Sequence, residues 1–185
     1  MSFFPLLNVT GSQGWTDLHN FPANNWELTH GAPRFIHATW SANGKWHSAP
    51  LGTLKPGASR RIQKADLAGD VPDNVTPFLS LNLRPLPARS DVLPASDLPK
   101  VHLPAWRATV GLSTPWARTS YQGEVDPFPP TGNMLTFGPF LQFDSGIKNY
   151  MLLLNLEKSP IRRFSQLEAH TADGKHLAKF TVENN

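Results

Sequence analysis

Three residues near the middle of the chain carry the side chains best suited to recognising a ligand: Trp116, Arg118 and Tyr121. An aromatic ring can stack on the C–H face of a sugar, and an arginine can donate paired hydrogen bonds to a polar rim. Trp40 and Trp46 add a second aromatic pair. We therefore predict that these five residues bind a ligand.

The tryptophans leave two alternatives open. Trp and Arg also dominate protein–protein interfaces, so the same residues suit a protein partner. Trp15 and Trp26 stand among polar residues, which is an unusual setting for a ring that normally seeks the core. A β-sandwich also buries some of its tryptophans, and that interpretation competes with both kinds of binding site.

Two carboxylates follow the Arg118 segment, at Glu124 and Asp126. On a strand, residues two apart share a face and lie about 7 Å apart, which permits a carboxylate pair for glycoside chemistry. Such pairs are also common on solvated sheet faces. No Gly-x-Ser-x-Gly motif is present, although Ser120 could join a distant His and Asp. We predict no catalytic residue; the enzyme alternative is a hydrolase or lyase with Glu124, Asp126 or a histidine as general base.

Histidines raise the possibility of a metal site. His37 and His47 flank one expected hairpin, and His170 and His176 flank another. No His-x-His pair occurs, and no carboxylate stands at a familiar ligand spacing.

The chain has no cysteine, which removes thiol catalysis, zinc ribbons and iron–sulfur clusters. The segment Gly11-Ser12-Gln13-Gly14 lacks the lysine of a phosphate loop. We predict neither a metal nor a cofactor.

The elements that position these residues are expected to be short strands. The chain has 185 residues with 18 prolines and 13 glycines, which leave no room for long helices. Alternating apolar and polar residues with intervening turn signals predict about ten strands. They are expected at 34–41, from 45 onward, 58–62, 78–84, 106–113, 118–125, 134–143, 150–157, 165–171 and 176–182. A turn of helix is expected at 64–68. This pattern predicts an all-β, antiparallel β-sandwich, immunoglobulin-like with extra strands.

We expect a single domain over 1–185. Two sub-units, 1–84 and 106–185, could be joined by the proline-rich crossover 85–105, which we interpret as a loop or sheet-edge connection. Residues 38–45 also align with 168–175, around Asn43-Gly44 and Asp173-Gly174. If this is a true repeat, the last strand needs a partner from the N-terminal segment or another subunit. That reasoning supports a structural subunit that assembles by β-strand exchange.

One region resembles a known family. A strand and the Asn43-Gly44 hairpin lead into Leu54-Lys55-Pro56-Gly57-Ala58-Ser59-Arg60-Arg61-Ile62, and the segment closes on Asp66-Leu67. This order, within residues 30–90, resembles the bacterial β-sandwich domains of the sensory rhodopsin transducer family and similar immunoglobulin-like modules. The resemblance implies a soluble, oligomeric binding or signalling domain, and it transfers no functional residue.

Charge and hydropathy limit the partners. The formal charge is +3, and the basic residues are spread along the chain rather than gathered in a stripe, so nucleic acid is an unlikely ligand. No stretch approaches 18 apolar residues, and the N-terminus lacks a basic leader region. We expect a cytoplasmic, non-catalytic binding or interaction module. Its partner would be a carbohydrate-like small molecule or a protein, and it could form a homo-oligomer.

Overall fold

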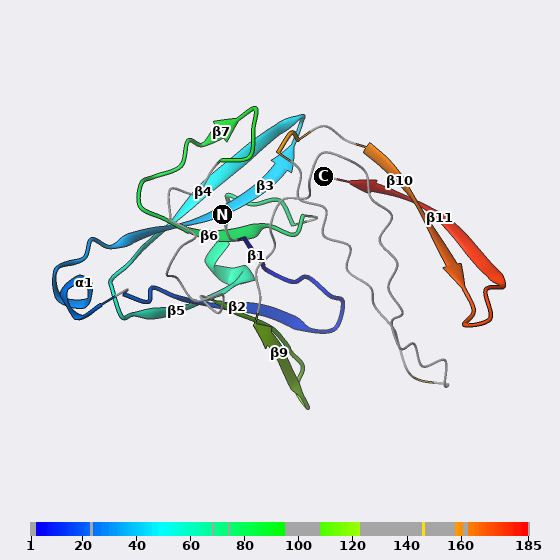
Figure 1. The fold of residues 1–185 in the computed structure, drawn as a ribbon, viewed down its shortest axis with the longest axis horizontal. Helices are drawn as coiled ribbons and strands as arrows, with labels where there is room; N and C mark the ends of the chain where they lie inside the picture. The colour runs from blue at the N-terminus through cyan, green and yellow to red at the C-terminus, as the bar shows by residue number, and fades with distance from the viewer. Residues whose placement is uncertain are drawn as a thin grey trace.

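The computed structural model describes residues 3–22, 24–67, 69–73, 75–94, 108–122, 146, 158–160 and 163–184. Apart from the short helix α1 (Asn25–His30) and the 3-10 turn η1 (Lys64–Leu67), the described elements are strands. Every pairing between the described strands is antiparallel. The predicted all-β antiparallel fold is confirmed (Figure 1).

The first sheet has the strand order β1-β6-β3-β4-β7. Its strands are β1 (Phe4–Pro5), β6 (Phe78–Asn82), β3 (Arg34–Ala42), β4 (Lys45–Leu54) and β7 (Arg89–Ser90). Asn43 and Gly44 both have positive φ, 52° and 69°, and form the predicted two-residue turn between β3 and β4. The short strand β7 lies within the proline-rich segment and pairs with β4, so this part of the segment forms an edge of the sheet.

The second sheet has the order β5-β2-β8-β9. Its strands are β5 (Ser59–Gln63), β2 (Gln13–His19), β8 (Ala108–Ser113) and β9 (Arg118–Gln122). The Pro56-Gly57 turn carries the chain from β4 in one sheet to β5 in the other. Because β8 pairs with β2, the hairpin of β8 and β9 shares a sheet with strands from the first half of the chain.

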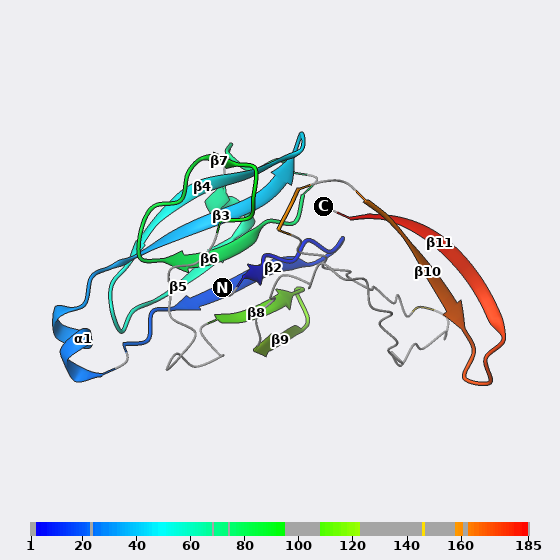
Figure 2. The same ribbon diagram turned by 45° about the horizontal axis from the view of Figure 1, so that its top comes forward.

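The two sheets lie face to face (Figure 2). Ile36, Ala38, Leu79 and Leu81 come from the first sheet, and they form one buried cluster with residues of the second. The partners from the second sheet are Leu18, Ile62, Ala108 and Val110. Burying one apolar face of each sheet stabilises this arrangement. The other face of each sheet points outward, away from this shared core.

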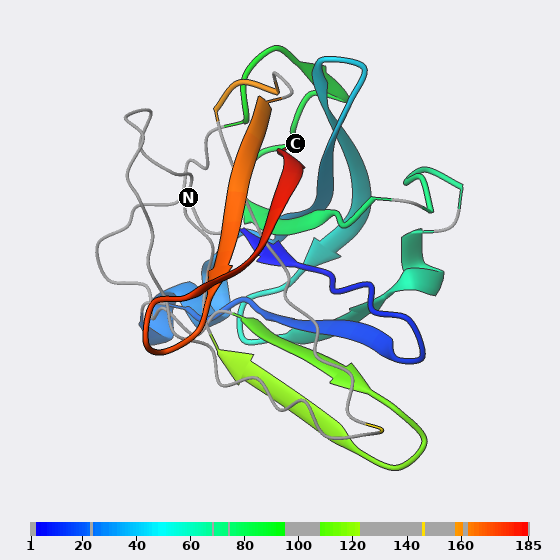
Figure 3. The same cartoon turned by 90° about the vertical axis from the view of Figure 1, so that its right-hand side faces the viewer.

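A third, two-stranded sheet of β10 (Arg163–His170) and β11 (His176–Asn184) extends away from the sandwich (Figure 1) and faces the viewer in Figure 3. β11 already has its partner strand, so the expected need for an outside partner at the C-terminus is wrong. The aligned turns also differ: Asn43-Gly44 forms a two-residue loop, whereas residues 171–175 connect β10 to β11. Their likeness therefore reflects turn chemistry rather than a repeated unit.

Four elements were missing from the sequence prediction. β2 and the two-residue strands β1 and β7 were not expected as strands, nor residues 25–30 as a helix. The expected turn of helix at 64–68 is η1. The strands expected at 134–143 and 150–157 lie outside the described residues. Across the ranges that the structure describes, no helix has the length and apolar character needed to cross a bilayer.

Candidate functional site: a polar sheet face

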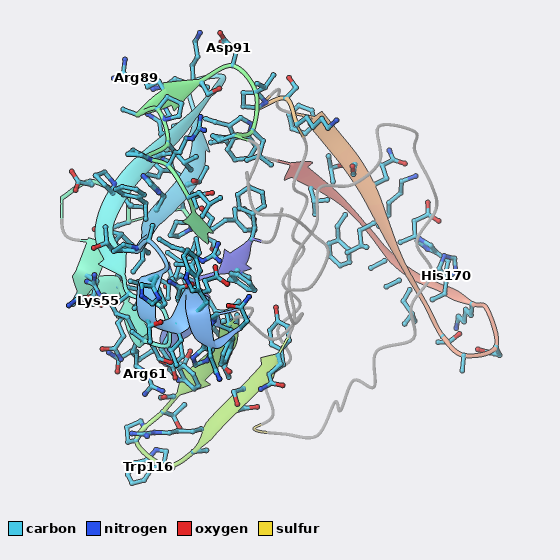
Figure 4. All side chains as sticks on the ribbon, turned by 60° about the vertical axis from the view of Figure 1, so that its left-hand side comes forward. Lys55, Arg61, Arg89, Asp91, Trp116 and His170 are labelled. Carbon is cyan, nitrogen blue, oxygen red and sulfur yellow. The ribbon has the colours of Figure 1, made fainter. Side chains whose placement is uncertain are left out.

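The structure places Trp116, Arg118 and Tyr121 together on the β8–β9 hairpin. Trp116 occupies the turn and is 91% exposed, and every residue of β9 is exposed. The turn is ordered by Thr114, whose Oγ1 accepts hydrogen bonds from the backbone N–H groups of Trp116 and Ala117. Figure 4 shows Trp116 at the end of this hairpin, away from the core. Glu124 and Asp126 lie outside the described residues.

Trp40 and Trp46 do not join this group. They are 7% and 2% exposed. The Trp40 ring stacks on His47 with a centroid distance of 5.6 Å, and Trp46 Nε1 donates to the Lys158 carbonyl at 3.1 Å. Trp46 also packs with Phe3, Phe78 and Leu93 in a buried cluster. The structure therefore does not present them to a ligand.

The strand register builds a second feature that the sequence did not reveal. Residues that pair directly across strands share a sheet face. The outward face of the second sheet therefore collects eleven polar side chains around Trp15 and Gly111, and we call this surface the polar platform. Its polar members are Gln13, Asp17, His19, Ser59, Arg61, Gln63, Thr109, Ser113, Arg118, Ser120 and Gln122.

Trp15 forms the floor of the polar platform. A Cβ placed on Gly111 would overlap the indole ring, so only glycine lets Trp15 lie this close to β8. Trp15 Nε1 donates to Ser113 Oγ at 2.9 Å, and the ring is 6% exposed. The absence of a side chain at Gly111 thus fixes a large planar ring within the sheet face.

Arg61 covers the other side of that ring. Its guanidinium carbon lies 4.1 Å from the Trp15 ring centroid, a cation–π contact. Asp17 accepts two hydrogen bonds from Arg61, from Nε at 2.8 Å and from Nη2 at 2.6 Å. Hydrogen bonding to Asp17 raises the pKa of Arg61 above its ordinary value. Two side chains that are normally mobile are therefore held in one plane.

Arg118 lies at the open edge of the polar platform, directly opposite Ser113. No carboxylate pairs with it among the residues that the structure describes, so its donors face solvent. Tyr121 points the other way, because it pairs with the buried Val110. Burial raises the pKa of Tyr121 above its ordinary value. The predicted trio therefore divides between the two faces of β9, with Trp116 at its end.

Sequence reasoning missed Trp15, Asp17 and Arg61 as a unit. The signal was present in the period-two alternation Gln13, Trp15, Asp17, His19, which places all four on one face of a strand. The partner Arg61 was visible only as part of a basic pair. Its contact with Asp17 spans 44 residues and depends on the pairing of β2 with β5.

The histidines form no metal centre in the described parts of the chain. His37 and His47 lie on opposite faces of the first sheet, since His37 pairs with Pro50 and His47 with Trp40. His170 and His176 do meet, with ring centroids 5.3 Å apart. Even so, the described residues contain no group of three or more His, Asp or Glu side chains able to hold a metal ion.

The polar platform is a surface rather than a pocket. One hollow of about 190 Å³ lies between residues 6–14 and 64–77 and meets the platform only at Gln13. Another, of about 440 Å³, lies beside the β3–β4 turn, next to Lys45 and Arg89. A flat face suits an extended ligand better than a small enclosed one.

The chain matches no protein-family model, no curated protein and no solved structure.

Proposed function

We propose that the chain is a non-catalytic binding module that holds a saccharide-like, hydroxyl-rich ligand across the polar platform. The observation that carries this proposal is the strand register, which gathers eleven polar side chains on one face around an ordered Trp15–Arg61–Asp17 unit. Each hydroxyl group of a saccharide can donate and accept a hydrogen bond, and the polar platform places donors and acceptors side by side on adjacent strands. Trp116, at the rim, offers an exposed ring for the C–H face of a sugar.

The ordering of Arg61 supports binding rather than catalysis. Asp17 is the single carboxylate of the polar platform, and Arg61 donates to both of its oxygens. Both oxygens of this carboxylate are therefore already engaged by a partner within the chain. Preorganised side chains instead lower the entropy lost when a ligand binds.

Neutral and uronic-acid oligosaccharides, titrated into the purified chain by calorimetry, test the proposal. We expect one class to bind, and we expect Arg118→Ala and Gln122→Ala each to weaken its binding about 5- to 30-fold, as for hydrogen bonds of about 1–2 kcal/mol. Trp26→Ala is the matched control, because Trp26 is 68% exposed but lies on α1, outside the platform. Absence of saccharide binding, or equal loss in the Trp26 variant, would overturn the proposal.

A protein partner remains the second candidate, and Trp116 favours it. A ring that is 91% exposed on a hydrogen-bonded turn is the kind of residue that anchors protein interfaces. In that case Trp116→Ala abolishes capture of the partner, while Gln122→Ala has little effect. The resemblance of residues 30–90 to the sensory rhodopsin transducer family, with its implied signalling role, stays a prediction alongside this candidate.

A further inference from the structure

The outer edge of β9 offers backbone groups for another strand. Among the strands that the structure describes, β9 is the last of its sheet. The Thr114 N–H donates to the Ala117 carbonyl at 2.8 Å, and bonded and non-bonded pairs alternate from that point along an antiparallel ladder. The N–H and C=O groups of Arg118, Ser120 and Gln122 therefore point away from β8, toward the open edge.

Exposed strand edges are usually protected against pairing by brevity, proline, charge or a bulge. β1 and β7 are two residues long, and β1 contains Pro5. β5 carries both Arg60 and Arg61. β10 and β11 bear charged residues and an irregular register. Within the described sheets, β9 has the least protection, with one charge at its first residue, no proline and an unbroken register.

We propose that β9 pairs antiparallel with β9 of a second copy of this chain, about a two-fold axis at Ser120. The two four-stranded sheets would then form one eight-stranded sheet. Because such an axis is perpendicular to the sheet, both polar platforms lie on the same continuous face. Assembly is thereby assigned to β9 rather than to the C-terminal strand.

The sequence of β9 is self-complementary in this register. Arg118 faces Gln122 of the second copy, so no like charges meet. Thr119 faces Tyr121, a β-branched residue beside an aromatic one, which is a favourable cross-strand pair. Ser120 faces its own symmetry mate, and its small side chain allows close approach.

Tyr121 supplies apolar area to this interface. It is 47% exposed, and each copy contributes one such ring. A fully buried aromatic side chain covers about 150–250 Å², so two partly exposed rings and one strand pair stay below the ~1,000 Å² of a specific interface. We therefore expect a dimer that dissociates on dilution.

Cysteine cross-linking tests the register directly, because the chain has no cysteine of its own. Paired residues on the axis have Cα atoms about 5.5 Å apart, within disulfide range. Ser120→Cys should therefore give a covalent dimer under mild oxidation. Thr119→Cys is the matched control: its symmetry mate would lie about 8 Å away, beyond disulfide range. Cross-linking of both variants alike, or of neither, would overturn the proposal.

Light scattering on the full chain tests assembly independently. We expect the mass to rise from 20.5 kDa toward twice that value with concentration. Ser120→Pro removes only an outward N–H, so the β8–β9 ladder is kept while pairing is lost; circular dichroism confirms the fold. A chain that stays monomeric, or a dimer unaffected by Ser120→Pro, would contradict the proposal. Saccharide binding that persists in the monomeric Ser120→Pro variant would show that the proposed function stands without the dimer.

Discussion

The outer faces of the two sheets are both rich in polar side chains, but only one is open. On the first sheet, His37, Thr39, Ser48, Ser80 and Asn82 are buried beneath the segment that follows β6. Their hydrogen bonds are internal: Thr39 with Ser48, and Asn82 with Ser80. On the second sheet the outward polar side chains are mostly exposed or half-buried.

The difference shows that polarity alone does not identify a binding face. His37 Nε2 accepts a hydrogen bond from the Leu86 N–H at 3.1 Å, and Ser48 N–H donates to the Ala88 carbonyl. These bonds fasten the covering segment to the first sheet. The polar side chains of the first sheet therefore bond mostly within the chain, although Asn82 Oδ1 has no partner among the described residues. Arg118 on the second sheet is exposed and pairs with no carboxylate in the described part of the chain.

The largest expected effect separates the two faces by their tryptophans. Trp46 packs with Phe3, Phe78 and Leu93 on the covered face. Trp46→Ala should lower the free energy of unfolding by about 3–5 kcal/mol. Trp116→Ala should change it by less than about 0.5 kcal/mol, because the ring is exposed. Urea unfolding of both variants makes the measurement, and similar losses would break the comparison.

Gly111→Ala tests the floor of the open face. The new methyl group would overlap the Trp15 ring. We therefore expect the free energy of unfolding to fall by about 1–3 kcal/mol and the near-ultraviolet circular dichroism spectrum to change. Ser120→Ala, on the neighbouring strand, serves as the control and should stay within about 0.5 kcal/mol of the parent chain. An unaltered spectrum for Gly111→Ala would mean that Trp15 is not held against β8.

The covered face should respond to pH through His37. Burial lowers the pKa of His37 below its ordinary value of 6.5. Below that pH the unfolded chain takes up a proton that the folded chain does not, so His37 stabilises the fold above pH 6.5 and this stability falls on acidification. The slope is at most about 1.4 kcal/mol per pH unit. Urea unfolding between neutral and mildly acid pH should show it, and His37→Gln should remove it. A slope unchanged in that variant would refute this role.

The smallest effect concerns the ion pair on the open face. Asp17→Asn should lower the free energy of unfolding by less than about 1 kcal/mol, because both partners are partly exposed and salt screens them. In urea unfolding, the difference in this free energy from the parent chain should shrink as salt is added. A larger, salt-independent loss would indicate that the Arg61–Trp15 contact depends on Asp17 for packing rather than charge.

The sequence predicted the elements with strong local signals. Asn43-Gly44 requires positive φ at both positions, so its hairpin could be located residue by residue. β2 was missed because its alternation includes Gly14 and the polar residues Gln13 and Asp17, and because no turn signal of that strength precedes it. Helix α1 depends on its cap: Asn24 accepts a hydrogen bond from the Glu27 N–H, a signal hidden among several asparagines.

The site was less accessible to sequence reasoning than the fold. Trp116 and Arg118 could be proposed from residue type, and the structure places both at the surface. Trp40 and Trp46 have the same residue type and are buried, since burial depends on which side chains from other segments pack on each face of the sheet. The polar platform could not be assembled at all without the pairing of β2 with β5 and β8, which joins residues far apart in sequence.

The most direct test of the polar platform is a ¹H–¹⁵N correlation spectrum that follows the six tryptophan indole N–H signals during titration with the saccharide that binds best. We predict that the Trp15 and Trp116 signals shift together and saturate, because one lies beneath the platform and the other at its rim. The signals of Trp26, Trp40 and Trp46 should stay in place. Shifts confined to Trp26, or to the buried pair, would contradict the assignment of ligand binding to this face.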